Sequence, residues 1–204
     1  MRTRQESTIF RNQAGYISTW WRGDPLPTLS STPDLYIERS ENVEALAHVM
    51  ECPREEVSNL LRKGHEAYIA RIGAQPVAVG WSARREAGFG GGLVTFRIPE
   101  GNRYLYDFVT LPAWRGRGIY PHLLQYILKA ESSTNERFWI VYQFTNTASK
   151  RGIEKAGFRL ASNVCFLDDG SLGLVPPPDA FERARACARL VGLPLIAGFT
   201  KDQD

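Results

Sequence analysis

The sequence predicts a mixed α/β domain, with a central, mostly antiparallel sheet of six or seven strands flanked by about four helices. Three observations favour this class. Short apolar runs bounded by turn formers alternate with amphipathic helical patterns along most of the 204 residues. The strand candidates of the first half follow one another through short turns, which is typical of antiparallel pairing. A helix candidate stands between two strands twice, near the middle of the chain and again near its end.

The strand candidates are short and rich in apolar or aromatic residues. They are Leu35–Glu38, Glu66–Ile72, Pro76–Ala83, Leu93–Ile98, Tyr104–Leu111, Phe138–Phe144, Phe158–Leu167 and Leu172–Val175. The helix candidates carry apolar residues at three- and four-residue spacing. They are Glu41–Met50, the segment from Pro53 to Gly64, Ile119–Ala130, Ala148–Ala156 and a last helix ending at Leu190. We expect Leu93–Ile98 to pair with Tyr104–Leu111 as a hairpin.

Polar residues and glycines mark the ends of several elements. Ser40 is expected to cap the first helix, since a side-chain oxygen there can accept from a free backbone N–H. Asp179 followed by Glu182 resembles a capping box for the last helix. The glycine-rich stretch Gly88–Gly92 is expected to be a flexible turn, because no helix start follows it as a phosphate-binding loop would require.

The chain is expected to have one domain with an extension at each end. Residues 1–33 place Trp20 and Trp21 among turn formers, which predicts an irregular arm on the surface. The tryptophans would then either cover an exposed flank of the core or form a lid over a substrate cleft. Residues 34–175 would form the main domain, and residues 176–204 a C-terminal helix and tail packed on it.

Composition excludes several classes of function. The net charge of +3 is mild and no stretch gathers many basic residues, so nucleic acid is not an expected partner. No apolar run approaches the roughly 20 residues that span a bilayer, and no signal peptide is evident. The three cysteines are widely spaced, which is typical of a reduced, cytoplasmic protein. They are Cys52, Cys165 and Cys187. No His, Cys or acidic cluster has the spacing of a metal site.

One stretch carries a chemical signal. A strand ends at Leu111, and the loop Arg115–Gly118 leads directly into an apolar helix. Glycines let successive backbone N–H groups converge, and the positive end of the helix dipole adds to them. The pattern indicates an anion site; the alternative is a tight turn with solvated arginines.

This stretch resembles motif A of the GNAT N-acetyltransferase superfamily, Val-x-Pro-x-x-Arg-Gly-x-Gly-x-Gly/Ala followed by an apolar helix. The matching residues are Val109, Arg115, Gly116, Gly118 and the pair Leu123–Leu124. Counted from Val109, Pro112 stands one residue later than the usual proline. Asn146–Phe158 resembles motif B, and Pro76–Trp81 resembles the upstream hairpin strand. The resemblance covers about Leu35 to Val175.

The resemblance implies a GNAT-like fold, with a splayed strand pair at the site of acetyl-coenzyme A, the acyl donor. It implies that the backbone of Val109 and Leu111, with Thr110 between them, pairs with the acyl and pantetheine amides. The implied pyrophosphate loop consists of Arg115, Gly116, Arg117, Gly118, Ile119 and Tyr120. Asn146 would bond the pantetheine arm, with Ser149 nearby.

The sequence departs from the family pattern at two places. Tyr120 stands where motif A has Gly or Ala, and Pro121 after it lacks an N–H. We expect the Tyr120 ring to point away from the pyrophosphate, either packing on Trp114 or lining the cleft. Ile153 stands where many members have a tyrosine that acts as general acid, so another group must protonate the thiolate, or the thiolate leaves unaided.

Candidates for the catalytic base lie in the strand before the loop. Asp107 is the first, because an acid in an apolar strand is costly to bury without a partner. The alternative is that it bonds the backbone or an arginine. Tyr104 and Tyr106, expected on the opposite face of that strand, could contact substrate or pass a proton. His122 is expected to be an exposed or capping residue. His48 and His65 are expected at the surface.

The predicted function is an acetyl-coenzyme A-dependent N-acetyltransferase that acts on a primary amine by direct attack. The amine would belong to a small molecule or a peptide, and the protein would be a monomer or homodimer. Two alternatives stay open. One is a non-catalytic acyl-coenzyme A-binding or regulatory domain, and the other is a transferase for a longer acyl chain.

Overall fold

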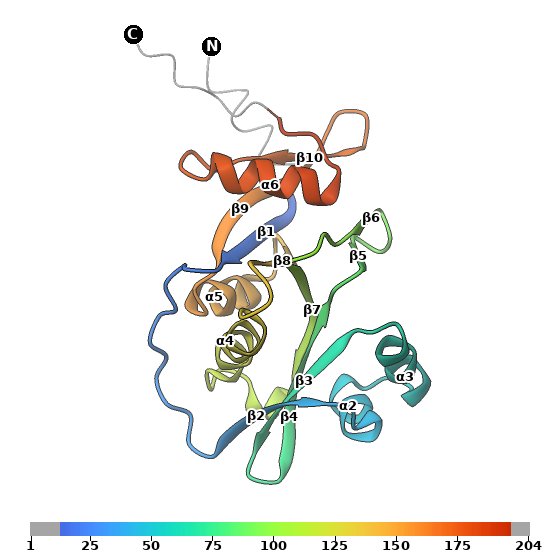
Figure 1. Cartoon of the computed structure of the whole chain (residues 1–204), viewed down its shortest axis with the longest axis vertical. Helices are drawn as coiled ribbons and strands as arrows, with labels where there is room; N and C mark the ends of the chain where they lie inside the picture. Colours follow the sequence, from blue (N-terminus) through green and yellow to red (C-terminus); the bar gives the residue numbers. More distant parts are fainter. Residues whose placement is uncertain (1–12, 197–204) are drawn as a thin grey trace.

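The structure, a computed structural model, describes residues 13–196 (Figure 1). Its strands are β1 (Gln13–Trp21), β2 (Leu35–Ser40), β3 (Glu66–Ile72), β4 (Gln75–Ala83), β5 (Glu86–Phe89), β6 (Val94–Arg97), β7 (Asn102–Thr110), β8 (Arg137–Gln143), β9 (Arg159–Phe166) and β10 (Leu172–Val175). Its helices are α2 (Val43–Met50), α3 (Arg54–Arg62), the 3-10 turn η1 (Pro112–Trp114), α4 (Ile119–Glu131), α5 (Thr147–Lys155) and α6 (Phe181–Val191).

Eight strands form one sheet in the order β10-β9-β1-β8-β7-β4-β3-β2, and β5 and β6 form a separate hairpin. Neighbouring strands in this sheet are antiparallel except β7 and β8, which are parallel. The helix α4 connects those two strands, as a parallel pair requires a crossover. The mixed α/β class and the mostly antiparallel sheet are confirmed, with more strands in the sheet than the expected six or seven.

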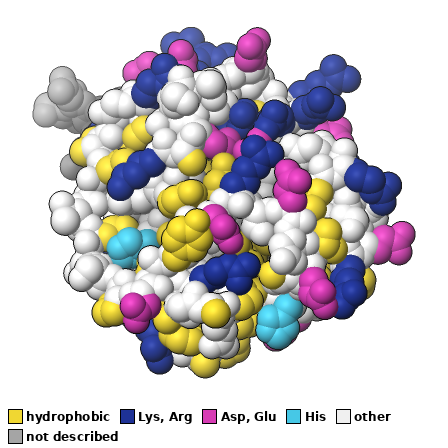
Figure 2. Space-filling model, turned by 60° about the horizontal axis from the view of Figure 1, so that its bottom comes forward, with side chains coloured by type: hydrophobic (Ala, Val, Ile, Leu, Met, Phe, Trp, Pro, Cys, Tyr) yellow, Lys and Arg dark blue, Asp and Glu magenta, His cyan; other side chains and the backbone are white. Residues whose placement is uncertain are grey.

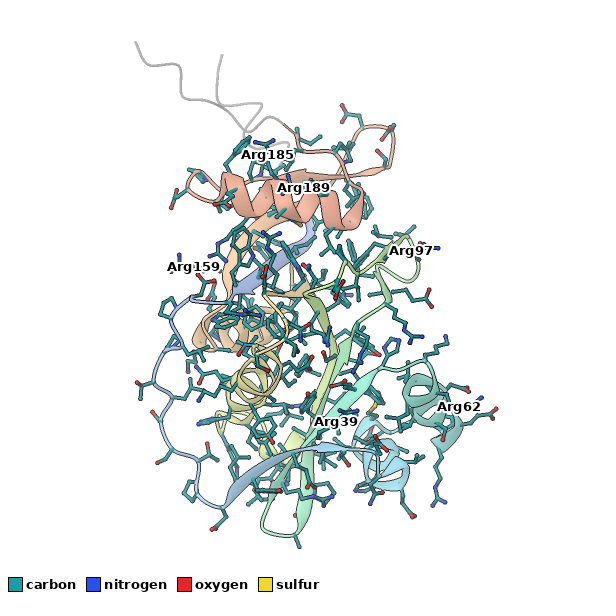
Figure 3. The ribbon with its side chains drawn as sticks, in the orientation of Figure 1. Arg39, Arg62, Arg97, Arg159, Arg185 and Arg189 are labelled. Carbon is teal, nitrogen blue, oxygen red and sulfur yellow. The ribbon has the colours of Figure 1, made fainter. Side chains whose placement is uncertain are left out.

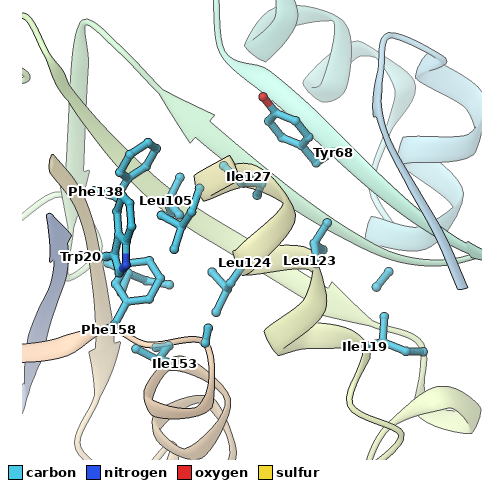
Figure 4. Close-up of a cluster of buried hydrophobic side chains, with 14 of the residues drawn as sticks. Trp20, Tyr68, Leu105, Ile119, Leu123, Leu124, Ile127, Phe138, Ile153 and Phe158 are labelled. Atoms are coloured by element: carbon cyan, nitrogen blue, oxygen red, sulfur yellow. The ribbon is translucent and has the colours of Figure 1, made fainter. Parts of the chain in front are cut away.

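Helices cover both faces of the sheet (Figure 1). On one face, α4 and α5 pack on a core that includes Trp20, Leu105 and Phe138, all shown in Figure 4. On the other face, α2 and α3 cover the β3–β4 side, and α6 covers β9 and the β5–β6 hairpin. The apolar spacing that predicted α4 thus faces the sheet, where Leu124 and Ile127 are fully buried.

The N-terminal segment differs most from the expectation. Residues 13–21 form β1, which lies between β8 and β9 in the middle of the sheet, so an irregular arm is wrong for these residues. Trp20 is 4% exposed and belongs to the core, neither on an exposed flank nor in a lid. Residues 22–34 contain no helix or strand and pass α4, where Gln125 donates to the carbonyl of Pro27 at 2.8 Å. Residues 1–12 and 197–204 of the expected end segments lie outside the described residues.

Two expected helix caps are wrong. Asn42 caps α2, its side chain accepting from the N–H of Ala45 at 3.0 Å, while the Ser40 hydroxyl accepts from the N–H of Asn42. The last helix begins at Phe181 after Ala180, which makes no side-chain cap. The expected capping box at Asp179 is therefore absent.

The glycine-rich segment differs from the expectation in part, since Gly90–Gly92 lie in a turn as expected but the residues before them form a strand. Glu86–Phe89 is a strand, β5, and it pairs with β6 through Gly88↔Thr95 and its neighbours. The expected hairpin of β6 with β7 is wrong, because β7 pairs with β4 instead. The short turns did indicate the hairpins of β3 with β4 and of β9 with β10, which the structure contains, whereas β1 and β5 were not predicted as strands.

Charged side chains are spread over the surface. The arginines labelled in Figure 3 are distributed over five elements, from Arg39 on β2 and Arg62 on α3 to Arg185 and Arg189, both on α6. On the face shown in Figure 2, basic and acidic side chains are interspersed. None of the helices within residues 13–196 has both the length and the apolar character needed to cross a membrane.

Two carboxylates are buried at the end of the sheet away from the loop before α4. Glu131 is 6% exposed and accepts hydrogen bonds from Arg103 Nε at 2.5 Å and from the Tyr68 hydroxyl at 3.0 Å. Glu66 is 7% exposed and forms an ion pair with Arg84. Each buried charge is paired, as burial of a carboxylate requires.

Candidate functional site

A cavity opens where β7 and β8 separate. The two strands pair from Asn102↔Arg137 to Leu105↔Ile140. Beyond these pairs β7 runs on to Thr110 with no pairing to β8 among the described residues, and a cavity of about 750 Å³ lies between the strands. The loop before α4 and the first turns of α4 and α5 complete its walls. The expected splayed strand pair is therefore present.

The backbone of β7 determines which groups face this cavity. The N–H of Leu111 donates to the carbonyl of Val77 on β4 at 2.9 Å, and its carbonyl accepts from the N–H of Trp114 at 2.9 Å. Backbone groups alternate sides along a strand, so those of Val109 also point to β4 and those of Thr110 point toward the cavity. The expected pairing of Val109 and Leu111 with a ligand is corrected: Thr110 has the free orientation.

The loop before α4 has the geometry of an anion site. Gly116 and Gly118 have φ of 78° and 77°, the left-handed region in which glycine carries no steric cost. Gly118 is the N-cap of α4, and the first N–H groups of a helix have no partner within it. Pro121 removes one donor from this turn. The His122 ring bonds the Gly118 carbonyl at 2.8 Å, as expected for a capping residue.

The two arginines of the loop have different orientations relative to the cavity. Arg115 lines the cavity and donates from Nε to the carbonyl of Thr110 at 3.0 Å. Arg117 stacks on the ring of Trp114, with its guanidinium carbon 4.7 Å from the ring centre, and does not line the cavity. Of the two, only Arg115 faces the cavity directly.

Helix α5 supplies cavity residues that the sequence predicted and others that it missed. The Asn146 side chain caps the helix by accepting from the N–H of Ser149 at 3.0 Å, and both residues line the cavity. Arg151 and Lys155 also line it, and their charges add to the positive potential of the helix start. Arg151 and Lys155 are spaced by one helical turn on a polar face, and this spacing is the sequence pattern that could have indicated them.

Tyr120 lines the cavity and does not pack on Trp114. Its ring lies against Phe108, with centroids 5.2 Å apart, and its hydroxyl is 3.3 Å from Ser149 Oγ. The Cδ1–Cε1 side of the ring lies against Gly152 on α5. Burial raises the pKa of the hydroxyl, so Tyr120 is neutral near pH 7. An aromatic side chain thus fills space that the family pattern leaves to Gly or Ala.

A β-bulge sets the position of Asp107. Between Tyr106 and Val109, β7 holds one residue more than β4, so Asp107 and Phe108 both stand opposite Gly80. Asp107 takes a left-handed φ of 47°, which is uncommon outside glycine. Such a bulge re-aims side chains and reverses the alternation beyond it. Asp107 is exposed and lines the cavity, so the expected burial is wrong while the expected location at the site stands.

The charge of Asp107 affects the pKa of both tyrosines of the strand. Although Asp107 is exposed as a residue, the protein around it partly desolvates its carboxylate, and this desolvation, with a smaller contribution from Glu56, raises the pKa of Asp107. In turn its negative charge adds to burial in raising the pKa of Tyr104 and of Tyr106. Tyr106 and Asp107 both line the cavity, so the expectation that they lie on opposite faces of the strand is wrong for Tyr106.

The two tyrosines have different surroundings. Tyr104 is 4% exposed, packs edge-on to Phe96 in the core and does not line the cavity, which does not favour the expected contact with substrate. Tyr106 stacks on it at 6.0 Å but lines the cavity. The Tyr106 hydroxyl is 2.5 Å from Nδ1 of His65, a residue expected at the surface. No sequence signal connects these two residues, which lie far apart in the chain.

The model of the acetyltransferase (GNAT) family matches residues 35–158, more than half of the chain. The chain belongs to this family. Acyl transfer from acyl-coenzyme A is the chemistry of the GNAT acetyltransferases. Counted back from Arg115, Pro112 stands at the family's proline position and Thr110 at that of the valine, which agrees with the backbone orientation of Thr110.

Solved GNAT structures share the fold. A GCN5-related N-acetyltransferase from Sphaerobacter thermophilus superposes with a TM-score of 0.53 at 14% identity, over 76% of this chain and 51% of that one. A GCN5-related N-acetyltransferase from Kribbella flavida superposes with a TM-score of 0.52 at 12% identity, over 79% of this chain and 62% of that one. A GNAT acetyltransferase from Colwellia psychrerythraea superposes with a TM-score of 0.51 at 15% identity, over 78% of this chain and 59% of that one. This GNAT chain thus spans at most about three fifths of the length of those proteins. No curated protein sequence matches it.

The residues present fit the phosphate and amide groups of a coenzyme A thioester. Backbone N–H groups of the loop and α4 face the cavity together with Arg115, Arg151 and Lys155, a donor set suited to a diphosphate. Ile153 is fully buried in the core, so the family's usual acid position offers no hydroxyl here. Within residues 13–196, no group of three or more His, Cys, Asp or Glu side chains is arranged to hold a metal ion.

Proposed function

We propose that this GNAT protein is an acetyl-coenzyme A-dependent N-acetyltransferase acting on a primary amine. The observation that carries the proposal is the cavity between β7 and β8, with cationic donors at one end and Tyr106 and Asp107 at the other. Acetyl-coenzyme A would supply an acyl group already activated as a thioester. The loop N–H groups, Arg115, Arg151 and Lys155 would hold its phosphates, and Thr110 its amide arm.

The acceptor end suits a cationic amine. The carboxylate of Asp107 would attract a protonated amine, because opposite charges attract strongly at a partly desolvated site. A base must also take the proton that leaves the amine before attack, and Asp107 is the candidate that the sequence offered. The rings of Tyr120, Phe108 and Tyr142 line the cavity, and their bulk favours a short acyl group over a long chain.

A thermal unfolding assay with coenzyme A tests cofactor binding. We expect the wild-type midpoint to rise with ligand, because binding to the folded state alone stabilises it. Arg151→Glu should remove most of that rise, since it places a negative charge on the cavity wall. Arg117→Glu, in the loop before α4, is the matched charge reversal and should retain most of it, because Arg117 stacks on Trp114 outside the cavity. No rise with any acyl-coenzyme A would contradict the proposal.

Release of free thiol from acetyl-coenzyme A over a panel of primary amines tests transfer. The second candidate function, a non-catalytic acyl-coenzyme A-binding domain, is favoured by one observation, the buried Ile153 at the usual acid position. Amine-dependent thiol release would support the transferase. Binding without release for every amine would support the second candidate.

A further inference from the structure

His65 and Tyr106 form a pair at the acceptor end of the cavity that neither family motif contains. Tyr106 Oη lies 2.5 Å from His65 Nδ1, and the rings meet edge to face at 5.6 Å. Tyr106 lines the cavity, while His65 stands behind it at the start of β3 and is partly buried. The histidine is thus connected to the cavity through a single hydroxyl.

The hydrogen bond determines what the tyrosine can offer to a ligand. Burial, with smaller contributions from Asp107 and Tyr104, raises the pKa of Tyr106, so the phenol keeps its proton. Among residues 13–196 its hydroxyl has no other hydrogen-bond partner than His65. The direction of this hydrogen bond depends on the histidine tautomer: with the proton on Nε2, the phenol donates to Nδ1 and keeps only lone pairs toward the cavity. In that tautomer a ligand there must be a hydrogen-bond donor.

The histidine is neutral and can accept a proton. Partial burial and the positive charge of Lys63 lower its pKa below the usual value, and the negative charge of Glu86 on β5 opposes this. Asp107 faces the same tyrosine from the bulge, and Glu56 on α3 faces Asp107. The neutral imidazole therefore predominates near pH 7, with Nδ1 available to Tyr106.

We propose that His65, acting through Tyr106, takes the proton of the acceptor ammonium, and that Asp107 binds the ammonium without being the base. This rests on the proposed function. In the step, one N–H bond of the ammonium breaks and its proton passes to Tyr106 Oη. The hydroxyl proton of Tyr106 passes to His65 Nδ1 at the same time. The products are a neutral amine, an unchanged phenol and an imidazolium, which returns its proton to solvent. His65 is thus a positioning residue for the proton path, and Tyr106 is the group that touches the amine.

The pH dependence of kcat/KM separates this mechanism from one in which the amine loses its proton in solution. With His65 as acceptor, the reactive form is the neutral histidine with the ammonium. The rate should then be flat from about pH 7 to about pH 9, below the pKa of an alkylamine near 10, and fall as His65 is protonated at lower pH. Without the acceptor, only the free amine reacts, and the rate should climb about tenfold per pH unit over that range.

His65→Asn is the decisive variant, because its side-chain oxygen can keep the hydrogen bond of Tyr106 but cannot take a proton. We expect kcat/KM near pH 7 to fall about 10²- to 10⁴-fold, the usual contribution of acid–base catalysis, with the flat profile replaced by the rising one. Tyr106→Phe should do the same. His48→Asn, on the exposed face of α2, should change neither. Asp107→Asn should raise KM and leave the profile flat.

Other outcomes contradict the proposal. A flat profile in His65→Asn, or a rising profile produced by Asp107→Asn, would overturn the assignment of the proton acceptor while leaving the transferase function standing. Nitrogen NMR of the imidazole gives a test that needs no activity. We expect the proton on Nε2 near pH 7, and a proton on Nδ1 would overturn the proposal. Absence of thiol release together with Nε2 protonation would contradict the proposed function and leave the hydrogen-bond polarity supported.

Discussion

The ring of Tyr120 lies directly against Gly152. A Cβ at position 152 would come within 2.3 Å of the ring atom Cδ1, closer than any real contact. Tyr120 stands where motif A has Gly or Ala, and here the small residue is on the facing helix instead. The two positions together keep α4 and α5 at packing distance, so the departure at Tyr120 is compensated within the site.

Gly152→Ala should destabilise the protein. Alanine improves helix propensity by about 1 kcal/mol, but overpacking against the ring costs about 1–3 kcal/mol, so the net change is a loss. In a Tyr120→Ala background the clash is gone, and the same substitution should be neutral or stabilising. Denaturant unfolding of the four proteins measures this coupling. Equal effects of Gly152→Ala in both backgrounds would show that the two residues do not interact.

Gly118→Ala tests the shape of the anion loop without a steric clash. Its Cβ would meet nothing closer than 3.7 Å, so space is available, but the left-handed φ of 77° costs an alanine about 1–2 kcal/mol. Relaxation of that strain would turn the N–H groups at the start of α4. We expect coenzyme A affinity to fall about tenfold or more by calorimetry. Gly73→Ala has a similar φ of 56° in the β3–β4 turn and is the control, which should lose stability but not affinity.

Asp107→Asn should stabilise the protein slightly while it impairs substrate binding. Because the folded state raises the pKa of Asp107, the ionised carboxylate is disfavoured by folding above that pKa. Below the usual pKa near 4 the carboxyl is neutral in both states, and the gain from asparagine disappears. We expect a gain of a few tenths of a kcal/mol at neutral pH, as for most exposed positions. Thermal unfolding from about pH 3.5 to about pH 8 would detect it. A gain that grows toward acid pH would contradict the sign of the shift.

Breaking the buried ion pair of Arg103 and Glu131 should have a large effect on stability. Arg103→Met leaves the buried carboxylate without its cation and should cost about 3–5 kcal/mol. Combining it with Glu131→Gln should recover part of that loss, since no charge is then buried. The exposed pair of Arg54 and Glu44 is the control, where Glu44→Gln should change stability by less than about 1 kcal/mol. Comparable losses at both pairs would show that burial is not the cause.

Sequence patterns over a few neighbouring residues predicted the features that depend mainly on those residues. Apolar spacing gave α4, and the glycines of its preceding loop gave an anion site that the left-handed φ of Gly116 and Gly118 supports. The splayed strands came from the family resemblance and not from the residues of β7 alone. These features depend on neighbouring residues, which a single sequence displays.

The features that were missed depend on distant residues. The strand β1 pairs with β8 and β9, more than a hundred positions away, and its tryptophans read equally well as part of a loop. The bulge at Asp107 exists because β7 must fit β4, and one extra residue exchanged the faces of the strand beyond it. The contact of His65 with Tyr106 joins β7 to the residue before β3, on the two sides of β4, so no local pattern could indicate it.

Hydrogen exchange with and without coenzyme A tests the central claim most directly, because it locates the ligand without relying on turnover. We expect slower amide exchange on ligand addition in residues 116–120 and 146–152, with β2 and α6 unchanged. Protection confined to other segments, or none at saturating coenzyme A, would contradict a cofactor site between β7 and β8.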